Sequence, residues 1–189
     1  MNYLIEVEVK AKIKDFESIK SKLKKINALK TKEEYQRDVY FNSPIKDFAK
    51  SDEALRIRKI SNKNENKTFI TYKGPKIDSS SKTREEIEIA IDESNQISQL
   101  FENLGFKKGK TVVKNREFYQ LNEYIITLDD VKGLGPYMEI EVELMDNNDY
   151  KLALDEIFKI FKKLGIEDGF ERKSYLELLE IESNHLSIK

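Results

Sequence analysis

Hydrophobic and polar residues alternate along much of this chain, which predicts a protein built mainly of β-strands. In residues 3–13, for example, Ile5, Val7 and Val9 alternate with charged residues, so a strand there has one apolar and one charged face. The same alternation, or a high content of β-branched and aromatic residues, recurs along the chain. The predicted strands cover roughly residues 3–13, 35–41, 53–60, 67–73, 83–91, 112–121, 123–130 and 137–144.

Four other segments carry apolar residues at helical spacing, and they cover roughly 15–29, 95–104, 149–164 and 171–180. Asp15 is the expected N-cap of the first helix, because an aspartate side chain accepts a hydrogen bond from the first helical turn. Gly105 and Gly165 are the expected ends of the second and third helices. We expect residues 1–180 to form a single domain and the tail, 181–189, to be loose.

The order of these elements repeats, because strand, helix and three strands are followed by the same series again. IEVEVKAKIKDF near the start resembles EEIEIAIDES from residue 85, and each is followed by a helix and a strand with an arginine. Glu8 and Arg37 are 29 positions apart, whereas Glu88 and Arg116 are 28 apart. Two pseudo-equivalent halves favour one closed or face-to-face assembly over two independent domains.

Charge is nearly balanced over the 189 residues, with 34 basic and 35 acidic side chains and a net charge of −1. This balance argues against a general binder of nucleic acid or of anionic membranes. No segment approaches the ~20 apolar residues that span a bilayer, and the charges within MNYLIEVEVK exclude a signal-peptide core. We therefore expect a cytoplasmic protein that binds neither nucleic acid nor membrane.

The sequence has no cysteine and a single histidine, His185. Their scarcity excludes disulfides, thiolate nucleophiles, Cys-ligated metal sites and histidine-based triads. Any chemistry must use carboxylates, Lys, Arg, Tyr, Ser or Thr. No general base stands out, and we assign no catalytic residue.

In an antiparallel sheet, a charged strand face is by itself typical of the side that faces water. Two features favour another interpretation. Glutamates two positions apart, Glu6 with Glu8 and Glu139 with Glu141, repel each other unless cations lie nearby. Arginine carries a bidentate fork suited to phosphate or carboxylate oxygens, whereas lysine suffices for solubility. Five of the six arginines fall on predicted strands, namely Arg37, Arg56, Arg58, Arg84 and Arg116.

Both features are satisfied if the strands close so that their charged sides face inward. We therefore predict an α+β fold: an eight-stranded antiparallel closed barrel with a polar, charged lumen and helices packed outside. Such a lumen holds an anion on Arg and Lys and a hard cation on carboxylates. Carboxylates without His or Cys favour Mg²⁺ or Mn²⁺ over zinc. A polyphosphate that chelates such a metal matches this mixture.

An ordered series of motifs resembles the CYTH, or triphosphate tunnel metalloenzyme, superfamily over about residues 3–180. It begins with Glu6-Val7-Glu8-Val9-Lys10, which matches the ExExK signature. The stretch Arg172-Lys173-Ser174-Tyr175-Leu176-Glu177 looks like the ending of CyaB-type class IV adenylyl cyclases. Between them lie Asp38-Val39-Tyr40-Phe41, Leu55-Arg56-Ile57-Arg58, Tyr72-Lys73-Gly74, Arg84-Glu85-Glu86-Ile87-Glu88, Lys114-Asn115-Arg116, Leu128-Asp129-Asp130-Val131 and Met138-Glu139-Ile140-Glu141.

The resemblance implies an eight-stranded triphosphate tunnel in which particular residues bind metal or substrate. It leaves open whether Arg37 faces the lumen or the surface. The implied ligands of Mg²⁺ or Mn²⁺ are Glu6, Glu8, Asp129, Glu139 and Glu141. The implied substrate-binding residues, which would contact phosphate oxygens, are Lys10, Arg56, Arg58, Lys73, Arg84, Lys114 and Arg116.

The implied reaction is that of an adenylate cyclase, which converts ATP to cyclic AMP and pyrophosphate. The alternative is a triphosphatase that hydrolyses inorganic triphosphate, thiamine triphosphate or a nucleoside triphosphate. A third hypothesis is a non-enzymatic module that binds polyphosphate or nucleotides. The many carboxylates disfavour it, because a site that only binds anions gains nothing from added negative charge. The resemblance to class IV cyclases also implies a homodimer.

Overall fold

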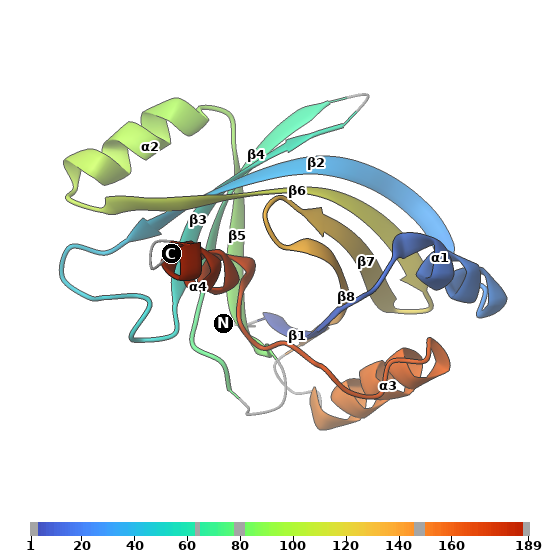
Figure 1. The fold of residues 1–189 in the computed structure, drawn as a ribbon. Helices are drawn as coiled ribbons and strands as arrows, with labels where there is room; N and C mark the ends of the chain where they lie inside the picture. The colour runs from blue at the N-terminus through green and yellow to red at the C-terminus, as the bar shows by residue number, and fades with distance from the viewer. Residues whose placement is uncertain (1–3, 63–64, 78–81, 146–149, 187–189) are drawn as a thin grey trace.

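The strands form a closed antiparallel barrel with helices outside it (Figure 1). The computed structural model describes residues 4–62, 65–77, 82–145 and 150–186. The strands are β1 (Leu4–Lys12), β2 (Leu29–Asn42), β3 (Ala54–Ser61), β4 (Asn66–Lys73), β5 (Arg84–Ile91), β6 (Lys107–Leu121), β7 (Tyr124–Val131) and β8 (Gly135–Met145). The helices are α1 (Phe16–Lys25), α2 (Ser94–Asn103), α3 (Tyr150–Lys163) and α4 (Tyr175–Leu186).

Around the barrel the strand order is β1-β5-β4-β3-β2-β6-β7-β8. Exchanging β1 with β5, β2 with β6, β3 with β7 and β4 with β8 leaves this circular order unchanged, and α1 and α2 occupy equivalent places in the chain. The topology therefore has the two-fold character that the sequence repeat predicts. Closure depends on a short ladder between β1 and β5, in which Ile5 pairs with Glu85 and Glu6 with Arg84.

Apolar residues on the outer strand faces pack beneath the helices in separate clusters. Helices α1 and α3 cover β1, β7 and β8, where Leu23, Ile157 and Phe161 are fully buried. Helix α2 lies on the other side of the barrel and places Phe101 against Phe41 of β2 (Figure 1). Because the apolar faces point outward to the helices, the charged faces point inward, which confirms the predicted fold. No helix within the described ranges is long and apolar enough to cross a membrane.

The inward face of β2 is the even-numbered one, because Glu34, Gln36 and Asp38 are buried and Arg37 is exposed. Arg37 therefore lies on the outside, although its counterpart in the repeat, Arg116, lies inside. The one-residue difference between the two repeat spacings accounts for this, since a shift of one residue moves a side chain to the opposite face of a strand.

Several boundaries differ from the prediction, and β6, for example, begins at Lys107 and not near residue 112. Helix α1 ends at Lys25, and Asn27 adopts a left-handed backbone with φ 61°, after which the chain enters β2 at Leu29. The first residues of β2 are exposed and lack alternation, so their strand conformation depends on pairing with β6.

The last helix begins and ends later than the predicted 171–180. Its start is fixed by a reciprocal pair of hydrogen bonds, in which Ser174 N donates to Glu177 Oε2 at 2.6 Å and Glu177 N donates to Ser174 Oγ at 3.2 Å. The helix continues to Leu186, so it includes part of the segment that we expected to be loose.

We expect Phe161→Ala to lower the free energy of unfolding by about 3–5 kcal/mol, because it leaves a cavity between α3 and the barrel. Leu152→Ala on the same helix is the matched control, since Leu152 is 67% exposed, and its effect should stay within about 0.5 kcal/mol. Urea denaturation followed by circular dichroism measures both. Equal losses for the two variants would show that α3 does not pack as described.

Candidate active site

The barrel encloses a charged cavity of about 460 Å³. All the predicted site residues point into the interior of the barrel, and ten of them line this cavity: Glu6, Glu8, Arg56, Arg58, Lys73, Arg84, Lys114, Arg116, Glu139 and Glu141. The other two, Lys10 and Asp129, lie behind Tyr175, which itself lines the cavity.

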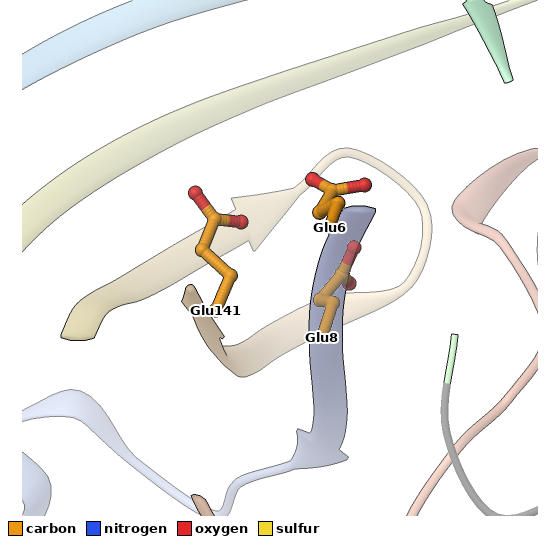
Figure 2. Close-up of side chains that lie close together, drawn as sticks. All are labelled: Glu6, Glu8 and Glu141. Atoms are coloured by element: carbon orange, nitrogen blue, oxygen red, sulfur yellow. The ribbon is translucent and has the colours of Figure 1, made fainter. Parts of the chain in front are cut away.

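Three carboxylates gather where β1 pairs with β8. Glu8 lies directly opposite Glu141 in that ladder, and Glu6 projects on the same side of β1 (Figure 2). One oxygen from each of the three carboxylates lies within 4.8 Å of the others. We call Glu6, Glu8 and Glu141 the carboxylate cluster.

This cluster concentrates negative charge that its surroundings compensate incompletely. Burial raises the pKa of Glu141 to about 8, and repulsion from Glu6 and Glu8 contributes to the rise. Burial also raises the pKa of Glu6 and of Glu8. Among the described residues, Glu141 has no hydrogen-bond or ion-pair partner. Three clustered oxygen donors without His or Cys fit a hard divalent cation such as Mg²⁺ or Mn²⁺.

Glu139 and Asp129, the other two predicted metal ligands, are instead engaged by basic side chains. Arg116 donates from Nε to Asp129 Oδ1 at 2.6 Å and also bonds to Glu139. The Tyr175 hydroxyl donates to Asp129 Oδ2 at 2.7 Å. Although burial alone raises the pKa of Glu139, the charges of Lys82 and Arg116 outweigh it and bring that pKa well below its usual range. These two carboxylates therefore orient Arg116.

The arginines of β3 are held by a carboxylate on β2. Arg58 donates from Nε and Nη2 to the two oxygens of Asp38, each at 2.7 Å. Arg56 Nη1 lies 3.6 Å from Asp38, and its Nη2 lies 3.5 Å from Glu86. Burial opposes the charge of Arg56, but these carboxylates raise its pKa, so the guanidinium stays cationic. Its Nε is buried and has no hydrogen-bond partner in the described part of the chain.

The lysines of the cavity fall into two groups. Lys73 Nζ lies 2.6 Å from Glu6 and 2.5 Å from Glu86, and despite burial these charges raise its pKa. Lys10 and Lys114 lie near the ring of Tyr175, and burial lowers the pKa of each to about 7. The cavity therefore combines lysines that are firmly cationic with others whose charge is disfavoured.

Arg84 also lines the cavity, and its guanidinium is turned to the backbone of the β4–β5 connection. Its Nη1 donates to the carbonyl oxygen of Gly74 at 3.2 Å. Arg84 therefore secures this connection next to the cavity.

Sequence reasoning missed several residues of the site. Lys82 bonds to Glu8 and lies 3.2 Å from Glu139, yet it belongs to a loop that gives no strand pattern. Asp38 and Gln36 were not assigned because the face of β2 was ambiguous. A strand start at Leu29 would have added Lys32 and Glu34 to the face of Gln36, Asp38 and Tyr40. The neighbouring residues of the other face are polar as well, so only the pairing with β6 identifies the inward face.

Comparison with known proteins places the chain in a family. Residues 4–175 match the CYTH domain model, and the chain therefore belongs to the CYTH domain family. A protein of Methanocaldococcus jannaschii, named provisionally as an adenylate cyclase, is 44% identical over 176 residues, which cover 93% of this chain and 98% of that protein. Members of the family are metal-dependent enzymes of adenylyl cyclase or triphosphatase type.

Solved structures support the same fold. A Pyrococcus horikoshii protein superimposes with a TM-score of 0.86 at 42% identity, covering 92% of this chain and 97% of the other. A Hippeastrum protein, provisionally called an adenylyl cyclase and described as having a dominant triphosphatase activity, superimposes with a TM-score of 0.63 at 20% identity. The superposition covers 97% of this chain and 96% of the Hippeastrum chain, and at that identity the likeness concerns the fold alone.

We expect Glu141→Gln to weaken Mn²⁺ binding by roughly tenfold or more, because it removes one charged ligand of the carboxylate cluster. Glu143→Gln is the matched control on the same face of β8, since Glu143 is exposed at the edge of the cavity and lies outside the cluster. Mn²⁺ titration by electron paramagnetic resonance measures both affinities. A similar loss in both variants would mean that the cluster does not hold the ion.

Proposed function

We propose that this protein is a metal-dependent adenylate cyclase that converts ATP to cyclic AMP and pyrophosphate within the barrel. The observation that carries the proposal is the presence, in one cavity, of the carboxylate cluster and of buried arginines and lysines. A pure anion site gains nothing from clustered carboxylates, whereas a site for a metal–polyphosphate complex needs both signs of charge.

Phosphoryl chemistry depends on positioning and on charge stabilisation, and the basic residues supply both. Arg56 offers its Nε, which has no hydrogen-bond partner among the described residues. Arg58 and Arg116 are held by hydrogen bonds to Asp38 and Asp129. Glu6, Glu8 and Glu141 would hold Mg²⁺ or Mn²⁺ at the carboxylate cluster, and the ion would supply positive charge against the negative charge that develops on the phosphates. The full set that we propose to contact phosphate oxygens is Lys10, Arg56, Arg58, Lys73, Arg84, Lys114 and Arg116.

In the proposed reaction the ribose 3′-hydroxyl of ATP loses its proton to water and its oxygen bonds to the α-phosphorus. The bond from that phosphorus to the oxygen that bridges it to the β-phosphorus breaks. Pyrophosphate leaves with negative charge that the guanidinium groups of the cavity stabilise. Since Arg58 and Arg116 are already oriented by carboxylates, they need little reorganisation as this charge develops.

Triphosphate hydrolysis in the same cavity is the second candidate. The dominant triphosphatase activity described for the Hippeastrum protein, which shares the fold, favours it. The two reactions differ in which phosphorus meets the nucleophile: the α-phosphorus for cyclisation, or a terminal phosphorus attacked by water for hydrolysis.

We expect incubation with ATP and Mn²⁺ to yield cyclic AMP and pyrophosphate, identified by mass spectrometry. The same assay with GTP, thiamine triphosphate and tripolyphosphate compares the candidate substrates. Formation of orthophosphate without cyclic AMP would show that the protein is a triphosphatase and not a cyclase. No product from any of the four substrates would end both proposals.

Glu8→Gln and Arg56→Ala should each lower turnover by more than about tenfold, since each removes a group that stabilises charge in the cavity. The control is Arg37→Ala, which removes an exposed arginine from the outer face of β2 and should keep activity within about twofold. Circular dichroism checks that all three variants fold. Full activity in both cavity variants would rule out this site.

A further inference from the structure

One part of the cavity wall carries a group of uncharged side chains, which lies among the charged Arg58, Lys114 and Arg116. It is formed by Ile60 on β3, Phe69 on β4 and Phe118 on β6, together with the amide of Gln36 on β2. Gln36 is paired with Ile60 across the β2–β3 ladder, and Phe69 is paired with Arg58 across the next one. We call these four residues the Gln36 wall.

The apolar members of the Gln36 wall are not part of the hydrophobic cores. Each is half-buried, and none belongs to the three clusters that pack beneath the helices in the described structure. Phe118 also has cations over its ring, with Lys32 Nζ 4.3 Å and Arg116 Cζ 5.7 Å from its centroid. Three apolar side chains facing a charged cavity are what a flat, unsaturated ligand group needs for stacking.

Gln36 adds a hydrogen-bonding group that lacks a partner. Its side chain is 1% exposed, and its Oε1 has no hydrogen-bond partner among the described residues. Buried amide oxygens are normally satisfied, so this acceptor calls for a donor from a ligand or a water.

The orientation of the amide is fixed by its neighbour Glu34. Gln36 Nε2 donates to Glu34 Oε2 at 2.7 Å, and the other oxygen of Glu34 accepts from Lys32 Nζ at 2.7 Å. A carboxylate in an ion pair accepts hydrogen bonds and does not donate them, so the nitrogen of the Gln36 amide must face it. The free oxygen therefore faces away from Glu34.

We propose that the Gln36 wall binds the purine base of the substrate and selects adenine over guanine. An adenine presents an N6 amino donor beside an N7 acceptor, and a glutamine amide can bond to both. Guanine places its O6 acceptor where adenine has the amino group, so it would meet Gln36 Oε1 with a second acceptor. The inference rests on the proposed function, because it assigns a base to the triphosphate that the cavity binds.

The position of the wall suits this assignment. Gln36 lies two residues from Asp38 on the same strand face, which is roughly 7 Å from the row that holds Arg58. The base would therefore lie beside the cationic groups, which include Lys114, the partner of Gln36 across the β2–β6 ladder. A volume of about 460 Å³ lies within the range of pockets for ligands of this size.

Calorimetry tests the proposal with analogues of ATP and GTP in which CH₂ groups replace the bridging oxygens, and with the equivalent base-free triphosphate, all with Mg²⁺. We expect the protein to bind the ATP analogue roughly tenfold or more tightly than the GTP analogue. Gln36→Met, which keeps the side-chain volume, should bring this ratio to within about twofold of one and leave base-free binding unchanged. Arg37→Ala should change neither quantity.

A second variant covers the case in which Gln36→Met does not fold. Phe69→Ala should weaken both nucleotide analogues several-fold through lost stacking and leave the base-free triphosphate unaffected. An unchanged ATP to GTP ratio in Gln36→Met would mean that water satisfies Oε1, and it would overturn the proposal. So would an equal loss of all three ligands in both wall variants.

The same measurements separate this inference from the proposed reaction. Selective binding of the ATP analogue without turnover of ATP would support the proposed base site and refute the proposed cyclase reaction. Binding of all three ligands with equal affinity would refute the proposed base site and would still be compatible with an enzyme that acts on triphosphates.

Discussion

Charge pairing inside a closed barrel is the constraint on which this structure depends. A charge taken out of water costs several kcal/mol unless an opposite charge or hydrogen bonds replace the solvent. The barrel meets this requirement with pairs on adjacent strands, such as Asp38 with Arg58 and Asp129 with Arg116. Among the described residues, Glu141 and the Nε of Arg56 are left incompletely paired, and both residues line the cavity. Pairing stabilises the barrel, and the incompletely paired groups mark the place where we propose that a metal–anion complex binds.

The outside of the barrel makes this interior possible. Because every strand has one apolar face, turning the charged faces inward leaves apolar faces that helices must cover. Helices α1 and α3 do so on one side and α2 on the other, whereas Ile87 and Ile89 on the outer face of β5 stay exposed. The same arrangement gives the two halves of the sequence equivalent places in the strand order, and so one repeated unit forms both walls of the cavity.

Strand alternation was sufficient to predict which side chains share a face, because a face is a local property of a strand. The closed barrel and the inward direction of the charged faces also needed the arginines on those faces and the glutamates two positions apart. The residues that were missed depend on contacts between distant segments. Arg37 and Arg116 could not be distinguished without the pairing of β2 with β6, and Lys82 reaches Glu8 from an irregular loop. The separation of the five acidic residues into a cluster of three and two partners of Arg116 also follows from side-chain geometry that spacing does not encode.

A crystal structure with Mn²⁺ and a non-cleavable triphosphate, with the metal located by its anomalous scattering, tests the central claim most directly. The account predicts a Mn²⁺ peak at Glu6, Glu8 and Glu141, with phosphate oxygens on Arg56, Arg58 and Arg116. Metal and triphosphate bound outside the barrel, with a lumen that holds neither, would contradict it.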